Sequence, residues 1–326
     1  MSDDLVLSIC ILVRNQVKDV ERLLNSIVPQ LKDGVEIVIR DGSTNDETKN
    51  FVREYSEYKQ IRYIYRPKED FDEKIISITQ DARGRFVWWM GDDDIADGGV
   101  EAVLNVINKV QDVTFIWANY VLINTNKFGM NLLNDRLFES RDEILIKGGI
   151  AIGFISSTIF RRDLALTGIR DAERYLGSSF MGLYLVLHVL SQPGKYFYIH
   201  GPVVVCYPAS NDEIKAVVVK AGGIIKNEAF EVFGVNFSNI VGNFSTAFSR
   251  STIRLTIKRS FAQTWRGVLV GWVGGWDTPK GKRLRMIKYF WMFPECWIAF
   301  VLFISPLPVN KLLYGLYKAL RLKREL

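Results

Sequence analysis

The stretch from Phe86 to Asp94 reads F-V-W-W-M-G-D-D-D, and it decides the predicted fold. Its five apolar residues are typical of a strand buried on both faces of a parallel sheet. Three adjacent carboxylates follow directly, and their mutual repulsion favours either a bound cation or a solvated turn. Because ligands bind beyond the carboxyl ends of the strands in open parallel sheets, we expect a cation site at Asp92, Asp93 and Asp94.

Similar apolar runs precede this strand along the chain, at residues 5–13, 35–39 and 61–65. Segments with apolar residues at helical spacing separate them, which predicts βαβ units and a mostly parallel sheet over about the first 115 residues. Farther along, we expect strands at residues 115–123 and 196–206 and a helix at 183–190. Beyond Asn211 we expect mainly helices, interrupted by the Gly- and Trp-rich residues 268–276.

Polar residues also follow the first two strands, namely Arg14 and Asn15 after the first and Asp41 to Asp46 after the second. The sequence contains no G-x-x-x-x-G-K-[ST] loop, and no G-x-G-x-x-G follows the first strand. A metal must therefore carry the charge of any bound phosphate. Hard oxygen ligands without a neighbouring His or Cys favour Mg²⁺ or Mn²⁺ over zinc.

These segments together resemble glycosyltransferase family 2, which has the GT-A fold. The resemblance rests on I-L-V-R-N (11–15), I-V-I-R-D-G-S-T-N-D (37–46) and G-D-D-D (91–94). Three further segments are similar to the abequosyltransferase-like branch that builds bacterial O-antigens: G-F-I-S-S-T-I-F-R-R (153–162), Y-L-G-S-S-F (175–180) and P-V-V-V-C-Y-P-A-S-N-D (202–212). The resemblance covers about residues 5–212 and implies a nucleotide-sugar half (1–115) and an acceptor half (116–212), followed by a helical region (213–326).

The resemblance implies roles for individual residues. Asp41 is expected to bind the base of a nucleotide diphosphate sugar, and Asp93 is the first choice for the Mn²⁺ or Mg²⁺ ligand. Gly91 stands where the family usually has its first acid, so Asp92 and Asp94 share the ribose and second-ligand roles without a ranking between them. The expected donor-binding residues are Val13, Arg14, Asn15, Asp41, Ser43, Asp46, Asp72 and Asp92, and the expected metal ligands are Asp93 and Asp94.

Family 2 enzymes typically invert the anomeric centre and use one carboxylate to take the proton of the acceptor hydroxyl. Asp171 and Glu173 are the candidates for this base, and the alternative is that both are surface charges in a helical turn. The expected acceptor or substrate-mouth residues are Ser156, Ser157, Ser210, Asn211 and Asp212.

The end of the chain differs in charge from the rest. The whole chain carries +6, but residues 265–326 hold 11 Lys or Arg and three acids, which is +8 and leaves −2 for the remainder. A basic, Trp-rich end favours an anionic membrane surface over nucleic acid. The apolar residues 289–304 are too short to span a bilayer and contain Pro294, so we expect a peripheral or monotopic arrangement, with a buried homo-oligomer interface as the alternative. Residues 311–326 have the spacing of an amphipathic helix.

Together these features predict an inverting, metal-dependent hexosyl- or deoxyhexosyltransferase. It would act at the cytoplasmic face of the inner membrane in O-antigen or surface polysaccharide synthesis. Its expected partners are a nucleotide diphosphate sugar and an undecaprenyl-diphosphate-linked oligosaccharide, with no nucleic acid. Two alternatives stay open: a polyprenyl-phosphate sugar synthase, and a degenerate GT-A domain that serves as a membrane scaffold.

Overall fold

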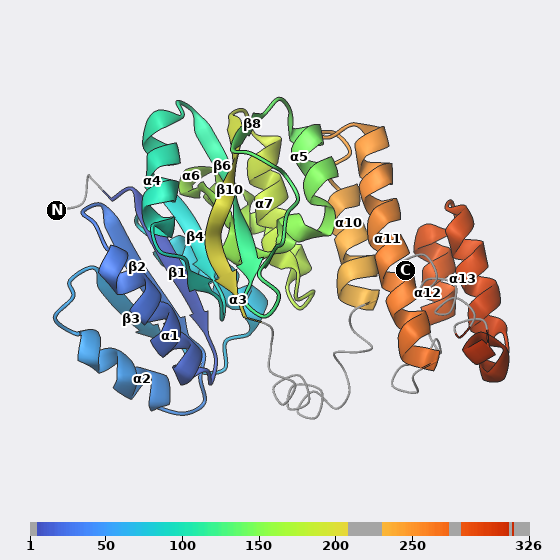
Figure 1. The fold of residues 1–326 in the computed structure, drawn as a ribbon, viewed down its shortest axis with the longest axis horizontal. Helices are drawn as coiled ribbons and strands as arrows, with labels where there is room; N and C mark the ends of the chain where they lie inside the picture. Colours follow the sequence, from blue (N-terminus) through green and yellow to red (C-terminus); the bar gives the residue numbers. More distant parts are fainter. Residues whose placement is uncertain (1–4, 208–229, 274–281, 313–314, 316–326) are drawn as a thin grey trace. The chain divides into compact units, whose positions relative to one another are not determined.

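A computed structural model describes residues 5–207, 230–273, 282–312 and 315 of the chain (Figure 1). The chain divides into two compact units, Met1–Pro208 and Ala209–Leu326. The first unit contains the strands and the polar clusters singled out from the sequence, and the second is helical wherever it is described with regular secondary structure.

The first unit is built on one mixed sheet, seen near the middle of that unit in Figure 1, with the strand order β3-β2-β1-β4-β9-β6-β10-β5. The predicted parallel arrangement is confirmed for four neighbouring strands: β1 (Leu7–Val13), β2 (Val35–Asp41), β3 (Ile61–Tyr65) and β4 (Phe86–Met90). Beyond β4 the sheet is mixed, which the sequence patterns did not predict.

The short strand β9 (Thr158–Arg161) causes this change of direction. It inserts between β4 and β6 (Val113–Leu122) and runs antiparallel to both. Next to β6 lies β10 (Lys195–Cys206), which is parallel to it and antiparallel to the two-residue strand β5 (Asp94–Ile95). Two short strands complete the sheet, β7 (Lys127–Phe128) on β6 and β8 (Arg136–Phe138) on β10.

Helices cover both faces of this sheet. Odd-numbered residues of β1, such as Ile9 and Ile11, pack with α1 (Val17–Ile27) and α4 (Gly99–Lys109) in one apolar cluster. On the other face, Cys10 and Trp89 contact α3 (Phe71–Asp81). Near α3 lie α6 (Arg162–Ala172) and α7 (Met181–Ser191), and the remaining helices of this unit are α2 (Glu47–Val52) and α5 (Arg141–Gly148).

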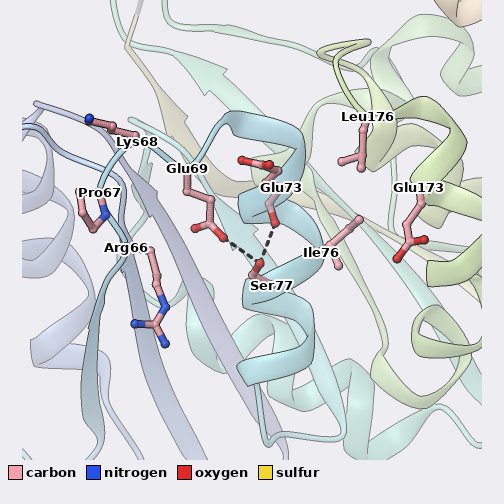
Figure 2. Close-up of a pocket in the computed structure, with 9 residues that line it drawn as sticks. All are labelled: Arg66, Pro67, Lys68, Glu69, Glu73, Ile76, Ser77, Glu173 and Leu176. Atoms are coloured by element: carbon pink, nitrogen blue, oxygen red, sulfur yellow. Dashed lines mark hydrogen bonds between the residues drawn. The ribbon is translucent and has the colours of Figure 1, made fainter.

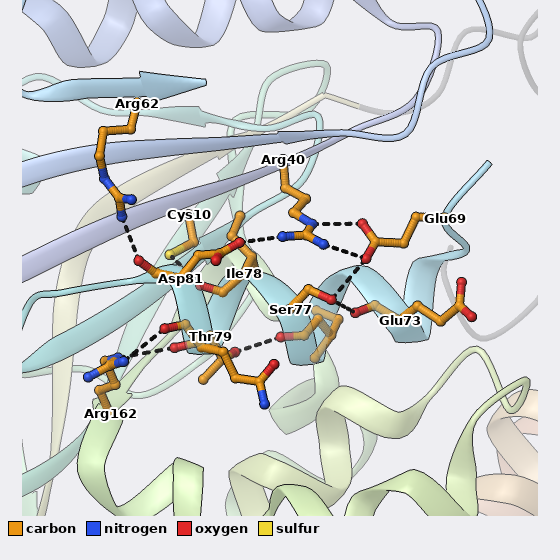
Figure 3. Close-up of polar contacts among 12 residues, drawn as sticks. Cys10, Arg40, Arg62, Glu69, Glu73, Ser77, Ile78, Thr79, Asp81 and Arg162 are labelled. Atoms are coloured by element: carbon orange, nitrogen blue, oxygen red, sulfur yellow. Dashed lines mark hydrogen bonds and ion pairs between the residues drawn. The ribbon is translucent and has the colours of Figure 1, made fainter. Parts of the chain in front are cut away.

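Buried charges fix α3 against the sheet (Figure 3). Arg40 of β2 donates two hydrogen bonds of 2.7 Å to the carboxylate of Glu69 and also pairs with Asp81. The last carbonyl groups of the helix accept hydrogen bonds from Arg62 and Arg162. These cations satisfy carbonyls that a helix C-terminus otherwise leaves unpaired. The N-terminal end of α3 is held equally well by a capping box of Asp70 and Glu73.

The second unit contains a π-helical segment (Phe230–Asn236), α10 (Phe237–Gly242), α11 (Arg250–Val273), α12 (Lys282–Phe290) and α13 (Pro294–Ile304). The predicted interruption from Val268 is wrong for residues 268–273, because α11 continues through them, whereas 274–276 lie outside the described residues. Pro294 is the first residue of α13 and separates it from α12, as expected of a residue that tolerates only the first turn of a helix.

The core of the second unit is largely aromatic. Phe261 stacks on Phe290 at 4.4 Å between ring centroids, and Phe303 of α13 is fully buried beside them. Within the described residues, none of the helices has both the length and the apolar character needed to cross a membrane. The helix predicted for residues 311–326 falls mostly outside the described residues.

Gly84, in the segment between α3 and β4, offers a test of how closely that segment approaches β1. A Cβ atom added there would lie 2.6 Å from the amide nitrogen of Ser8 and 2.7 Å from the carbonyl carbon of Leu7. Since backbone atoms cannot give way cheaply, we expect Gly84→Ala to lower the free energy of unfolding by about 1 to 3 kcal/mol. Gly201→Ala is the matched control, because nothing lies within 4 Å of its added Cβ. Urea denaturation measures both, and equal stabilities of the two variants would contradict this packing.

Candidate active site

A cavity of about 310 Å³ lies at the carboxyl ends of β1 and β4, beside the first turn of α3. Four residues singled out from the sequence line it: Arg14, Asp92, Asp93 and Ser156. They come from segments up to 142 positions apart, and the fold brings their side chains together at one edge of the sheet. We call this the strand-end cavity.

Asp93 is the most constrained carboxylate of the cavity. It is 3% exposed, and its Oδ2 accepts a 2.6 Å hydrogen bond from Ser156 Oγ. The thiol of Cys206 and the backbone of Tyr207 also donate to it. Burial is the main cause that raises the pKa of Asp93 to about 6, and the charge of Asp92 adds to it. A buried carboxylate with a raised pKa in a cavity is a group that gains from a bound cation.

Asp94 already has a cationic partner. Arg22 Nε donates to both of its oxygens, at 2.9 and 3.1 Å, and the same guanidinium donates to the carbonyl oxygen of Asp92. The guanidinium carbon lies 4.0 Å from the ring centroid of Tyr207. Because Arg22 engages both oxygens of Asp94, a metal would have to displace it, which favours Asp92 and Asp93 as the ligands of the strand-end cavity.

The expected base-binding residues form a hydrogen-bonded ring across the ends of β1 and β2. Buried Asp41 accepts from the amide of Ser43 at 2.8 Å and from the hydroxyl of Tyr63 at 2.6 Å. Asn15 has a positive φ of 56°, which lets its amide donate to Ser43 Oγ and its side chain accept from the amide of Thr44. The ring therefore fixes the shape of the chain where a nucleotide is expected.

Two other expected donor residues lie away from the strand-end cavity. Asp72 is buried and accepts hydrogen bonds from the amides of Ser179 and Met181, so it anchors the start of α7. Asp46 is exposed and forms a 3.4 Å ion pair with Lys49. Neither residue lines the cavity, and their donor-binding roles stay predictions.

The candidate bases Asp171 and Glu173 do not line the strand-end cavity. Glu173 lines a second cavity of about 480 Å³, which Glu73 of α3 also lines (Figure 2). Asp171 is exposed and pairs with Arg174 at 2.8 Å. Of the acceptor residues, Ser157 is buried and its hydroxyl donates to the carbonyl oxygen of Phe154. The expected residues Ser210, Asn211 and Asp212 lie outside the described residues.

No group of three or more His, Cys, Asp or Glu side chains among the described residues is arranged to hold a metal ion. Asp92 and Asp93 nevertheless fit the usual Mg²⁺ site of nucleotide enzymes, which takes one or two carboxylates and completes its shell with substrate phosphates and water. The oxygen-only character of this pair suits Mg²⁺ or Mn²⁺.

Lys74 lines the strand-end cavity and was missed by the sequence analysis. A lysine on an amphipathic helix is usually solvated, but this one is 4% exposed, and burial lowers its pKa to about 8. A signal was available in Asp70 and Glu73, whose spacing is that of a capping box. It would have started the helix at Phe71 and placed Lys74 in its first turn, next to the strand ends.

Comparisons with known proteins place this geometry in context. Residues 8–167 match the family described as glycosyl transferase family 2. The abequosyltransferase RfbV of Salmonella typhimurium is 25% identical in an alignment of 228 residues that covers 62% of this chain and 66% of that protein. An uncharacterized glycosyltransferase of Rickettsia felis is 28% identical over 123 residues, or 36% of this chain and 20% of that one. The family resemblance expected from the strand-end motifs is thereby confirmed.

A solved structure supports the fold. The crystal structure of S. aureus TarS 1-349 superposes with a TM-score of 0.51 at 15% identity, covering 83% of this chain and 88% of that one. A likeness at this identity concerns the fold alone. It agrees with a mixed sheet covered by helices in the first unit.

The raised pKa of Asp93 predicts how the stability of the protein depends on pH. Between about pH 4 and 6, the folded state binds the proton of the Asp93 carboxyl more tightly than the unfolded chain does. The free energy of unfolding therefore falls as pH rises through that window, and it stays lower above it. In a chelator-containing buffer at pH 7.5, we expect Asp93→Asn to raise the free energy of unfolding by about 1 to 3 kcal/mol, with little difference near pH 4.

Asp94→Asn is the matched control for this experiment. It should lower stability at pH 7.5, because it weakens the pairing that holds the partly buried Arg22. Denaturant unfolding at several pH values measures both variants. A loss of stability in Asp93→Asn at pH 7.5 would show that its charge is compensated within the protein.

Proposed function

We propose that this chain, whose residues 8–167 match glycosyl transferase family 2, is a glycosyltransferase that moves a sugar from a nucleotide diphosphate sugar to a hydroxyl of a lipid-linked oligosaccharide. The observation that carries the donor class is the strand-end cavity, in which Asp92 and Asp93 face the same space as Arg14 and Lys74. The O-antigen context is proposed from the resemblance to the abequosyltransferase-like branch, which the match to the Salmonella abequosyltransferase supports.

Asp92 and Asp93 are the proposed holders of Mn²⁺ or Mg²⁺. A divalent ion at these carboxylates would neutralise the negative charge that develops on the nucleoside diphosphate leaving group. The protein's own contribution is orientation. Ser156 fixes the carboxylate of Asp93, and Arg22 holds the turn that carries both acids through the carbonyl oxygen of Asp92.

The acceptor hydroxyl must lose a proton, and we propose a carboxylate base for an inverting reaction. Glu173 is the better supported of the two candidates, since it lines a cavity whereas Asp171 pairs with Arg174 at the surface. The first turns of α3 contribute to both cavities, through Lys74 to one and Glu73 to the other.

We also propose that the second unit places the enzyme on the cytoplasmic face of the inner membrane. The inner face of α13 buries Cys296, Ala299 and Phe303 in the aromatic core, yet its outer face is also apolar. A helix that is apolar all round is not stable against water. The exposed apolar residues of α13 are Trp297, Ile298, Val301 and Ile304, each about half exposed, and we call them the outer face of α13.

Charged and aromatic neighbours fit this arrangement. Trp291 is 59% exposed just before α13, and Lys288 and Lys311 are exposed on either side of the helix in sequence. Indole rings and lysines around an apolar face are the composition of segments that lie in the interface of anionic bilayers. The membrane position would bring the active site to an acceptor carried by a lipid.

Ligand binding tests the donor and metal proposal. We expect one or more nucleoside diphosphate sugars to raise the melting temperature in the presence of Mn²⁺, because a ligand that binds only the folded state stabilises it by about 2.7 kcal/mol at 100 times its Kd. Asp93→Ala should lose this gain, whereas Asp97→Ala, a change at an exposed acid beyond the β4 turn, should keep it. If no nucleoside diphosphate sugar stabilises the wild-type chain with Mn²⁺ or Mg²⁺, the donor proposal fails.

Product analysis tests the acceptor. Mass spectrometry of the lipid product should show a new glycosidic bond to a sugar hydroxyl of the oligosaccharide. A sugar joined directly to a lipid phosphate would instead identify a polyprenyl-phosphate sugar synthase. Donor binding without any turnover on lipid acceptors would favour the scaffold alternative.

Vesicle binding tests the membrane position. We expect the full chain to sediment with vesicles containing phosphatidylglycerol, and the double variant Ile298→Ser/Val301→Ser to lose most of this binding, because it removes two apolar side chains from the outer face of α13. Leu133→Ser in the first unit is the control, because it removes an apolar residue that is even more exposed, and it should bind as the wild type does. Lipid-independent dimers that the double variant breaks would show instead that a second copy covers this face.

A further inference from the structure

Lys74 is a buried cation with unused hydrogen-bond donors. Its Nζ donates to the carbonyl oxygen of Val13 at 2.8 Å, and this is its one hydrogen bond among the described residues. A lysine ammonium carries three N–H donors, so two are left for a ligand in the strand-end cavity. Leaving such donors unpaired where water is largely excluded is costly, and a bound acceptor would remove that cost.

The carboxylates whose negative charge acts on Lys74 are engaged by other groups. Asp41 accepts from Tyr63 and from Ser43, as described above. Glu69 is held by two hydrogen bonds from Arg40 and one from Ser77 (Figure 3). These acids help to keep Lys74 charged from a distance, but no ion pair joins an acid to Lys74 among the described residues.

Arg14 adds a second positive charge to the same cavity. It is exposed, lines the cavity together with Lys74, and forms no ion pair within the described part of the chain. Its charge opposes that of Lys74 strongly enough to be the largest electrostatic influence on it after burial. Two cations that line the same cavity and repel each other are stabilised together by an anion that contacts both.

The strand-end cavity therefore has two unlike walls. Arg14 from the end of β1 and Lys74 from α3 form a cationic wall, and Asp92 and Asp93 after β4 form an acidic wall. We propose that Arg14 and Lys74 bind the diphosphate of the donor directly, so that the phosphate charge is shared between these side chains and a cation on the acidic wall. The inference rests on the proposed function and adds to it a specific anion-binding pair.

The number of cations favours a diphosphate over the carbonyl oxygens of a base. A base carbonyl is neutral and would leave the repulsion between Arg14 and Lys74 in place, whereas a diphosphate offers several charged oxygens to both. A carboxylate on an acidic donor sugar shares this chemistry with the diphosphate. The experiment must therefore separate these two sources of charged oxygen.

Inorganic pyrophosphate is a probe that needs no knowledge of the base or the sugar. We expect calorimetry in EDTA to detect pyrophosphate binding to the full chain, weakened by added salt. Lys74→Gln should raise the Kd roughly 10- to 100-fold, since a hydrogen bond to a charged group contributes about 1.5 to 3 kcal/mol. Lys59→Gln removes the same charge from an exposed position of the same unit and should leave the Kd unchanged.

Three further measurements exclude a purely structural role. Lys74→Gln should not lower the melting temperature, because it removes a buried charge, and Lys74→Arg should restore pyrophosphate binding at least in part. Glucuronate, which has a sugar carboxylate but no phosphate, should not compete with pyrophosphate. Competition by glucuronate at equal concentration would overturn the assignment to the diphosphate.

Wild-type-like pyrophosphate binding by Lys74→Gln, or none by the wild type in EDTA, would also overturn the inference. Either result leaves the proposed function standing if nucleotide sugars still bind with Mn²⁺. The proposed function fails separately if the wild-type chain binds neither pyrophosphate nor any nucleoside diphosphate sugar when Mn²⁺ is present.

Discussion

The contact in which Arg22 Nε donates to both oxygens of Asp94 fixes the turn on which the site depends. Arg22 projects from α1 and reaches both the side chain of Asp94 and the carbonyl oxygen of Asp92, so a helix packed on one face of the sheet sets the course of the chain after β4. That course brings β5 onto β10 and turns Asp93 toward Ser156. Because Arg22 neutralises Asp94, Asp92 and Asp93 are the acids of this turn that contribute negative charge to the cavity. The proposed metal binding and donor orientation both depend on this one ion pair.

The sequence predicted those parts of the fold that depend on local pattern. Strands β3 and β4 begin and end where their apolar runs do, because buried parallel strands leave an unbroken apolar signature. Apolar spacing alone predicts this helix over residues 75–82, four residues after α3 begins at Phe71, because it ignores the capping box at Asp70 and Glu73. Strand β9 was not predicted, because four residues between a short 3-10 helix and α6 carry too little pattern and its neighbours β4 and β6 are distant in sequence.

The residues of the candidate site also divide into those that the local sequence pattern predicts and those that it does not. Asp93 and Arg14 could be proposed from sequence, since polar residues after buried strands must lie at the sheet edge. The roles of Lys74, Arg22 and Ser156 could not, because each depends on which helix or turn packs against that edge. Asp72 illustrates the reverse case. Its type and position suited a ligand-binding role, yet its carboxylate is used to hold the amides at the start of α7, a contact across more than 100 residues.

Cys206 gives the site a chemical reporter of its own charge. Its thiol lies against Asp93 at the end of β10, and burial together with the negative charge of Asp93 raises the pKa of the thiol to about 12. A proton or a cation that neutralises Asp93 removes this negative charge and so lowers the pKa of the Cys206 thiol. The rate at which a small alkylating reagent modifies Cys206 thus becomes a readout of occupancy, because only the thiolate reacts. The position of Cys206 thus allows the charge of Asp93 to be followed without a substrate.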